Sequence, residues 1–499
     1  MYTPSLQKFE KKAEQGNLIP VYRELVADVD TPVSAYMKLR HLGNGYSCLL
    51  ESVEGGESVA RYSYIACSPY RIMSSKGSEV TIREGDELST RSLGPDEDPL
   101  DVLKDLLGEY DFVSPETPDR FYGGAVGYLS YDMVRFFEDL PDENVDDLNL
   151  PDSQFVFTDN LVIFDHVMHR LRIVANAHVT DNPQSAYWDA VARIDRMAEA
   201  LQEPLDATAP AAVTPKIPDD PSALKSTMTR LQHREAVAKA REYISAGDVI
   251  QAVISHRLSV DLDVEPFDLY RGLRAINPSP YMYYLNLGEA QLIGASPELL
   301  VRSENGNVVT RPIAGTRRRG KTEEEDTMLA EELLADEKER AEHVMLVDLH
   351  RNDIGRVCRP GSVDVDVFME VERYSHVMHI VTNVIGELAD EHDNYDLLRA
   401  VFPAGTVTGA PKIRAMEIIE ELEPCRRGPY AGVVGYFSYS GAMDTCITLR
   451  TIVSKDGTYH FQAGGGIVAD SEPDFEYEET LLKMGALLDA ARMAERGLS

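Results

Sequence analysis

Residues 331–353 read EELLADEKERAEHVMLVDLHRND, and this segment contains the first of two matching acidic pairs. Its apolar residues recur at helical spacing and predict a helix: Val344, Leu346, Val347 and Leu349. Glu339 and Glu342 stand three residues apart on one side of that helix. A largely buried carboxylate pair needs a proton, a basic neighbour or a metal ion, because burial and like charge both disfavour the ionised form. The alternative is a solvated acidic face, which is common in acidic proteins.

A second pair occurs far along the chain, in GGGIVADSEPDFEYEETLLKMGALLDAARMAE, residues 464–495. Glu476 and Glu479 again stand three apart, at the start of an amphipathic helix and shortly after three glycines. Glycines allow a ligand to approach the backbone closely. Two such helices could converge on one hard cation with oxygen ligands, and Mg²⁺ fits best because it also leaves positions for an anionic substrate.

The net charge of the chain is −35, from 84 acidic and 49 basic residues. This balance argues against nucleic acid or an anionic membrane as a partner. Acidic clusters are spread along the chain at residues 96–98, 142–147 and 323–326. We expect a halophilic protein, whose self-repulsion is offset by screening at high salt.

The five cysteines form no C-x-x-C pair and are odd in number, so neither a disulfide framework nor a zinc site is predicted. No run is long and apolar enough to span a membrane, and the first residues lack the apolar core of a signal peptide. We therefore expect a cytoplasmic protein.

Short β-rich runs precede residue 200, and alternating strands and helices follow residue 225. The intervening sequence PLDATAPAAVTPKIPDDPSAL is rich in Pro, Ala, Thr and Asp and reads as a linker. We predict an α/β protein with large, mostly antiparallel sheets and helices packed outside, divided into residues 1–203, a linker at 204–224 and residues 225–499. YAGVVGYFSY from Tyr430 echoes YGGAVGYLSYD from Tyr122, which suggests either a duplicated sheet unit or coincidence.

Five ordered motifs resemble the chorismate-binding enzyme family. They are PIAGTRRRG (312–320), DEKERAEHVMLVDLHRND (336–353), YSHVMHIV (374–381), PAGTVTGAPK (403–412) and AGGGIVADSEPDFEYEET (463–480). The similarity covers the whole C-terminal half and extends more weakly to the N-terminal half through LLES and the Gly/Tyr strand. It implies a two-domain enzyme of this fold that acts on chorismate, a dicarboxylate.

The resemblance assigns roles to particular residues. Substrate-binding groups are Gly315, Thr316, Tyr430, Arg450, Gly464, Gly465, Gly466 and Lys483. Direct Mg²⁺ ligands are Glu342 and Glu479, with Glu339 and Glu476 nearby or bonding through water. Glu298 resembles the acid that protonates the leaving hydroxyl and requires a raised pKa, whereas without the family it would read as an ordinary helix-start glutamate. His379 resembles the histidine beside the ring, and Thr406 a hydroxyl near the substrate; Lys412 reads equally well as a structural ion-pair partner.

Two positions distinguish members of the family. Relatives that add water to chorismate carry a lysine base where this chain has Gln251, and a glutamine cannot take a proton from water. Para-aminobenzoate relatives commonly carry a lysine nucleophile where this chain has Ala314. Both positions favour direct amination by ammonia to give anthranilate and pyruvate, the first committed step towards tryptophan. Para-aminobenzoate synthase component I and a non-catalytic sensor of chorismate or tryptophan remain as alternatives.

No cysteine lies in a nucleophile elbow. The resemblance therefore implies a separate glutamine amidotransferase subunit, component II, in a heterotetramer of two large and two small subunits, although the sequence alone does not give the oligomeric state. LLES and NPSPYM resemble segments that bind tryptophan as a feedback inhibitor. The residues predicted for this allosteric site are Leu50, Glu51, Ser52, Asn277, Pro280, Tyr281 and Met282.

Overall fold

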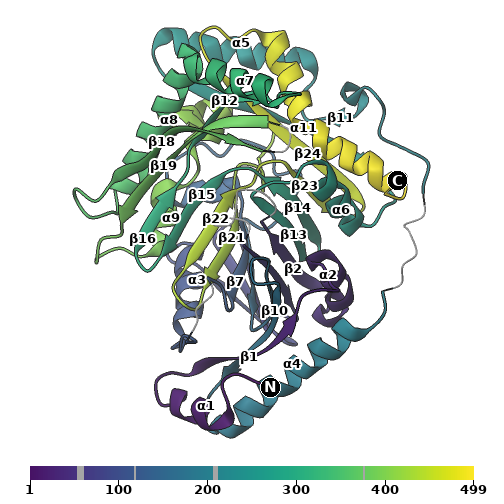
Figure 1. Cartoon of the computed structure of the whole chain (residues 1–499). Helices are drawn as coiled ribbons and strands as arrows, with labels where there is room; N and C mark the ends of the chain where they lie inside the picture. The colour runs from purple at the N-terminus through teal and green to yellow at the C-terminus, as the bar shows by residue number, and fades with distance from the viewer. Residues whose placement is uncertain (53–60, 117–119, 206–211, 375–376, 499) are drawn as a thin grey trace.

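The computed structural model describes residues 1–498 apart from 53–60, 117–119, 206–211 and 375–376. Within these residues, two antiparallel sheets of twelve strands each form the centre of the molecule (Figure 1). The first runs in the order β1 (Leu18–Val26), β10 (Arg170–His178), β9 (Asn160–Asp165), β3 (Tyr62–Cys67), β2 (Tyr46–Glu51), β13 (Tyr281–Leu287), β14 (Ala290–Ser296), β23 (Thr451–Lys455), β24 (Thr458–Ile467), β12 (Gln251–Asp261) and β11 (Lys225–Ser226), with β20 (Gly409–Ala410) paired to β12.

The second sheet runs in the order β17 (Ile313–Arg318), β19 (Val377–Glu387), β16 (Asn307–Thr310), β15 (Leu299–Glu304), β22 (Met443–Ile447), β21 (Val433–Ser438), β7 (Gly124–Leu129), β8 (Ser153–Thr158), β4 (Arg71–Lys76), β5 (Glu79–Glu84) and β6 (Glu87–Ser92), with β18 (Asp364–Arg373) paired to β19. The helices are α1 (Leu6–Lys12), α2 (Pro32–Leu39), α3 (Pro99–Gly108), α4 (Pro183–Gln202), α5 (Arg230–Ala246), α6 (Pro266–Ile276), α7 (Glu323–Ala335), α8 (Glu337–Gly355), α9 (Asn394–Val401), α10 (Lys412–Leu422) and α11 (Pro473–Glu495). Short 3₁₀ turns are η1 (Arg40–Gly43), η2 (Tyr131–Phe136), η3 (Pro221–Ala223) and η4 (Gly405–Val407).

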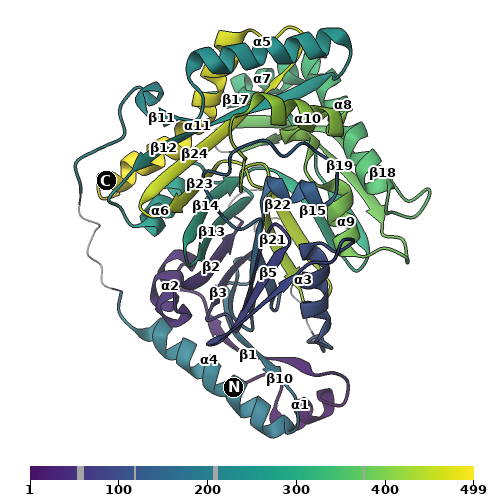
Figure 2. The same ribbon diagram turned by 180° about the vertical axis from the view of Figure 1, so that it is seen from behind.

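The core lies in layers between and outside the two sheets. Strand β13 shows why, because its side chains alternate: Tyr283 and Leu285 face the apolar layer between the sheets, whereas Met282 and Tyr284 face the layer under the helices. Helices α1, α2, α4, α6 and α11 cover the outer face of the first sheet, where α10 packs on β12, and α3, α8 and α9 cover that of the second (Figure 2). This confirms the predicted fold class, antiparallel sheets with helices outside.

The two Gly/Tyr segments lie side by side in the second sheet. Strand β21 pairs antiparallel with β7, and Gly435 stands opposite Gly127. A Cβ atom at Gly127 would lie 1.9 Å from the carbonyl oxygen of Gln154, so the close approach of the backbones requires glycine there. The two similar segments are thus adjacent central strands, one from each half of the chain.

Both sheets take strands from either side of residues 204–224. Strands β2 and β3 of the first sheet join β13, and β7 and β8 of the second join β21. The predicted halves therefore share their sheets, and the domain division remains a prediction. No helix among the described residues is long and apolar enough to cross a membrane.

Two details of the predicted elements were wrong. The single helix expected within residues 331–353 is broken at Asp336, whose carboxylate accepts hydrogen bonds from the backbone N–H groups of Lys338 and Glu339 and so caps α8. Val344 is 48% exposed, because the buried stripe of α8 runs through Leu346 and Val347 together with two histidines, His343 and His350.

Candidate active site

Three glycines of β24 form the floor of the candidate site. Gly464, Gly465 and Gly466 pair with β12, and side chains from other elements approach each of them. A Cβ atom at Gly464 would lie 2.9 Å from the Tyr430 hydroxyl, and one at Gly466 would lie 2.2 Å from Gln251 Nε2. Crowding therefore requires glycine at these positions of the strand, on which polar groups converge.

Glu298 follows β14 and is 6% exposed. Burial raises the pKa of its carboxyl to about 8, and the nearby Thr406 hydroxyl opposes part of this rise. Glu298 Oε1 and Thr406 Oγ1 are buried atoms that make no hydrogen bond to other described residues. At neutral pH this carboxyl holds a proton that it can donate, as a general acid must.

His379, on β19, contacts the bulge of β17. Its Nδ1 lies 2.8 Å from the carbonyl oxygen of Gly315 and 3.2 Å from Thr316 Oγ1. Gly315 has a φ of 63°, in the left-handed region that suits glycine, where the pairing register of β17 shifts. Burial lowers the pKa of His379, so its ring is neutral, donates from Nδ1 and leaves Nε2 as an acceptor.

Arg450 and Tyr430 supply the cationic, donor-rich side of the site. Arg450 makes no ion pair with any described residue, and burial lowers the pKa of its guanidinium. Tyr430 is 7% exposed, and burial raises its pKa to about 12 although Arg427 opposes the rise. An unpaired arginine in a protein of net charge −35 is suited to an anionic ligand such as a carboxylate.

The two acidic pairs each have one member bound to a basic side chain of the protein. Glu339 lies 3.1 Å from Arg317, and Glu479 lies 2.7 Å from Lys483 Nζ. Lys483 also donates to the carbonyl oxygen of Gly464 over 3.0 Å. Lys483 therefore joins the start of α11 to the glycine strand.

Glu342 and Glu476 form no ion pair among the described residues. Burial raises the pKa of both carboxyls, and Lys338 and Lys483 oppose the rise at both. The same two lysines act on both glutamates, so these parts of α8 and α11 lie close together. No three His, Cys, Asp or Glu side chains in the described part of the chain are grouped closely enough to hold a metal ion. The donor set nevertheless fits a hard dication, since all four candidate ligands are carboxylates and no ion pair with a described residue balances the charge of Glu342 and Glu476.

Gln251 and Lys412 complete the predicted set. Gln251 begins β12, is 6% exposed and lies against Gly466, and its amide opposes the pKa rise of Glu342. Lys412 lies 2.7 Å from Asp353, so it is the structural ion-pair partner that the sequence left open. Of the alternatives for Lys412, the structural one is confirmed.

A separate cavity lies where β2 meets β13. All of the residues predicted for tryptophan except Asn277 line it: Leu50, Glu51, Ser52, Pro280, Tyr281 and Met282. Asn277 caps the C-terminus of α6 and is not among the lining residues, so its role in the site remains a prediction. Ser52 Oγ is buried without a hydrogen-bond partner among described residues. Glu51 turns its carboxylate to Arg274 on α6, 3.0 Å away.

Sequence reasoning missed other groups of this cavity. Arg302 and Asp444 form an ion pair at 2.8 Å, and Asp444 accepts a hydrogen bond from the Tyr281 hydroxyl at 3.0 Å. Arg120 and Tyr436 also line the cavity. These residues come from β15, β22, β21 and a loop, and only the pairing of the strands brings them together.

Residues 46–489 match the profile of the family described as chorismate binding enzyme. This chain belongs to that family. Among the relatives of this chorismate-binding enzyme, anthranilate synthase component 1 of Acetivibrio thermocellus is 47% identical, over 99% of each chain. The protein of the same name from Thermus thermophilus is 49% identical, over 96% of this chain and 99% of its own.

Solved structures agree with this placement of the chorismate-binding enzyme. The crystal structure of anthranilate synthase component I from Streptococcus pneumoniae covers 93% of this chain and 99% of its own, with a TM-score of 0.75 and 36% identity. The menaquinone-specific isochorismate synthase of Escherichia coli has the same fold, with a TM-score of 0.70 at 17% identity over 98% and 99% of the two chains.

Proposed function

We propose that this chain is the chorismate-using component of an anthranilate synthase. In this reaction chorismate and ammonia give anthranilate, pyruvate and water. One feature of the site carries the proposal. It combines a protonated acid, Glu298, and a free cation, Arg450, with residues that supply neither a base at position 251 nor a nucleophile at position 314. The proposal is supported by relatives named anthranilate synthase component 1, to which the chain is similar over nearly their full length.

The site residues fit an amination with two eliminations. Ammonia adds to carbon 2 of the ring, the double bonds shift, and the bond from carbon 4 to its hydroxyl breaks. The ammonium group formed at carbon 2 releases one proton to solvent and becomes the amine. Glu298 gives its proton to this hydroxyl, which leaves as water. His379, with Nε2 as acceptor, then takes the proton from carbon 2 while the enolpyruvyl ether bond breaks, and the ring becomes aromatic. The released enolate takes up a proton at its methylene carbon to become pyruvate.

The substrate would be bound by hydrogen-bond donors on the glycine strand and on the residues around it. Arg450 and Tyr430 hold a carboxylate, with the backbone of Gly464 to Gly466 and the Gly315–Thr316 bulge completing the shell. Lys483 and Thr406 lie at the edge of the same shell. Glu342 and Glu479 would hold Mg²⁺, with Glu339 and Glu476 beside them. When bound, Mg²⁺ would act as a Lewis acid towards a substrate carboxylate.

Ammonia would come from a separate glutamine amidotransferase subunit, in a complex of two large and two small subunits. An amidotransferase of the usual kind needs a reactive thiolate. Burial raises the pKa of the Cys358 thiol to about 11 and that of Cys67 to about 12, and Cys48 and Cys446 are also buried. Burial raises the pKa of the half-buried Cys425 as well. These thiols are poor nucleophiles, and free ammonia would replace the partner at high concentration.

Tryptophan would bind in the cavity between β2 and β13 as a feedback inhibitor. The Ser52 hydroxyl offers a free polar contact, and Tyr281 and Met282 offer apolar surface for the indole. The cavity connects directly to the acid. Tyr281 pairs with Ser296, two residues before Glu298, and Ser296 Oγ donates to the carbonyl oxygen of Ile447 over 2.6 Å. Occupancy of the cavity would therefore shift β14 and the acid that follows it.

The first experiment is turnover of chorismate without a partner, in high-salt buffer with Mg²⁺ and ammonium, followed by anthranilate fluorescence. We expect anthranilate that disappears with chelator and decreases with tryptophan. Aminodeoxychorismate as the product would assign the chain to the para-aminobenzoate branch. Chorismate binding without consumption would assign it as a sensor.

A further inference from the structure

A fully buried guanidinium lies directly behind the candidate site. Arg427 is 2% exposed and belongs to the loop between α10 and β21. Its Nε and one terminal nitrogen donate to Glu423, at 3.0 and 2.6 Å. Its terminal nitrogens also donate to the carbonyl oxygens of Val407 and Val253, at 2.7 and 2.8 Å. The guanidinium therefore bonds to three separate segments of the chain.

Each of these segments carries part of the site. Val253 pairs with Gly466 on the glycine strand, and Val407 directly follows Thr406. The guanidinium carbon also lies 5.6 Å from the ring centre of Tyr430. A single side chain thus contacts the support of the glycine floor, the hydroxyl turn beside the acid, and the tyrosine of the carboxylate pocket.

Glu423 extends the same set of contacts. It is 4% exposed and accepts hydrogen bonds from the backbone N–H and the hydroxyl of Ser255, at 2.7 and 3.0 Å. Ser255 pairs with Gly464, on the same face of β12 as Val253. The ion pair therefore holds β12 at two alternate positions, behind both outer glycines of the floor.

We propose that Arg427 is a positioning residue for chorismate, which sets the relative placement of Tyr430, the Thr406 turn and the Gly464–Gly466 strand. A buried ion pair contributes little net stability, since its desolvation offsets its attraction. Balancing the Glu423 charge would need only one donor group, whereas Arg427 also bonds to two carbonyl groups on different segments. The forked, planar guanidinium is suited to this geometry, which a lysine cannot reproduce. The identity of the ligand rests on the proposed function; the role of Arg427 does not depend on the reaction product.

The test compares a single and a double substitution with a matched control. Arg427→Gln leaves Glu423 buried without its partner, so the variant tests charge balance and positioning together and is expected to be destabilised. The double variant, with Glu423→Gln and Arg427→Gln, removes both charges. It therefore tests the positioning role separately from charge balance. The control is Arg71→Gln. Arg71 is also buried, donates to the carboxylates of Glu84 and Glu109 over 2.7 and 2.8 Å, and lies over two aromatic rings. It differs from Arg427 in its place, because it belongs to β4 and not to the site.

We expect the double variant to fold and to bind tryptophan as the wild type does, while its kcat/KM for chorismate falls by about 10- to 100-fold through misplacement of the site. The Arg71 control should keep its kcat/KM. Recovery of wild-type kcat/KM in the double variant would overturn the proposal and leave Arg427 as a counter-charge only. If the wild type makes a different product, the proposed function fails, and calorimetric binding of chorismate to the same variants still tests the role of Arg427.

Discussion

Glu298 illustrates how a single side chain acquires its chemistry from its surroundings. The sequence predicts an acid here only by resemblance to a family, because a glutamate after Ser-Pro is an ordinary feature of helix starts. In the structure no helix follows, and β15 begins with the next residue, Leu299. Burial, which only the assembled sheets provide, raises the pKa of the carboxyl to about 8.

Glu298→Gln should reduce kcat by about 10²- to 10⁴-fold, the usual contribution of a positioned acid. In the wild type, activity at constant free ammonia should fall as the pH rises through about 8, because Glu298 loses its proton there. The folded-state pKa is raised from 4.5 to about 8, so the stability due to the protonated carboxyl is lost as the pH rises from about 4.5 to about 8. A pH profile of kcat and of the melting temperature for both proteins checks this. A wild-type profile that stays flat through pH 8 would contradict it.

Ser52→Phe should fill the cavity beside Tyr281 and raise the tryptophan concentration for half-inhibition by about tenfold or more, while turnover without tryptophan is unchanged. Asn277→Ala is the matched control, because Asn277 does not line the cavity and its substitution should leave inhibition intact. The check is inhibition of anthranilate formation by tryptophan. If the Ser52 variant were as sensitive to tryptophan as the wild type, tryptophan would not bind in this cavity.

At the scale of elements, helical periodicity predicted α8 and α11, and their matching acidic pairs suggested that the two helices could converge on one cation. It did not reveal the break at Asp336, because a capping aspartate between two strongly helical segments is indistinguishable from another helix residue in a sequence pattern. The pairing of Arg317 with Glu339 was also hidden, since it depends on the β17 bulge. Motifs therefore supplied the candidate site residues, whereas their partners across strands came only from the fold.

Glu342→Gln should stabilise the protein in chelator at pH 8 and abolish its stabilisation by Mg²⁺. Burial raises the pKa of Glu342, so its ionised form at this pH is unfavourable without a cation, and the amide removes that cost. Binding of Mg²⁺ to the wild type at 100 times Kd would add about 2.7 kcal/mol. The measurement is the melting temperature with Mg²⁺ and with chelator. Glu478→Gln serves as a control, because Glu478 is exposed and paired with Arg230.

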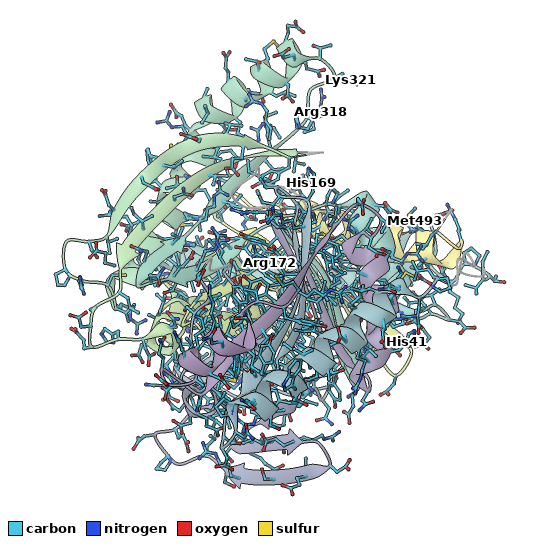
Figure 3. The ribbon with its side chains drawn as sticks, turned by 60° about the horizontal axis from the view of Figure 1, so that its bottom comes forward. His41, His169, Arg172, Arg318, Lys321 and Met493 are labelled. Atoms are coloured by element: carbon cyan, nitrogen blue, oxygen red, sulfur yellow. The ribbon has the colours of Figure 1, made fainter. Side chains whose placement is uncertain are left out.

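At the scale of the whole molecule, the acidic clusters take part in specific ion pairs. Members of all three predicted acidic clusters form ion pairs, among them Asp98 with Arg399, Asp147 with Arg257 and Asp326 with Arg319. Arg318 and Lys321 lie together at one end of the molecule, beside the acidic start of α7 (Figure 3). The clusters thus combine solvated charge with specific contacts, which composition alone did not indicate.

Removing salt should unfold the protein, because a net charge of −35 repels itself more strongly as the Debye length grows from about 3 Å at 1 M to about 10 Å at 0.1 M. We expect the melting temperature to rise steadily with KCl, a salt chosen over sulfate to limit effects on apolar burial. Circular dichroism against KCl concentration checks the expectation. Equal stability at both ends of the series would show that the acidic surface is not an adaptation to salt.

The shared sheets have a consequence for synthesis on the ribosome. Strands β2 and β7 emerge early, yet their partners β13 and β21 are translated only after residue 280. Until then each early strand presents an unpaired edge, which is a site for association with other chains. A nascent chain interrupted in its middle is therefore expected to aggregate, whereas the two halves made together as separate polypeptides retain the partners that each sheet requires.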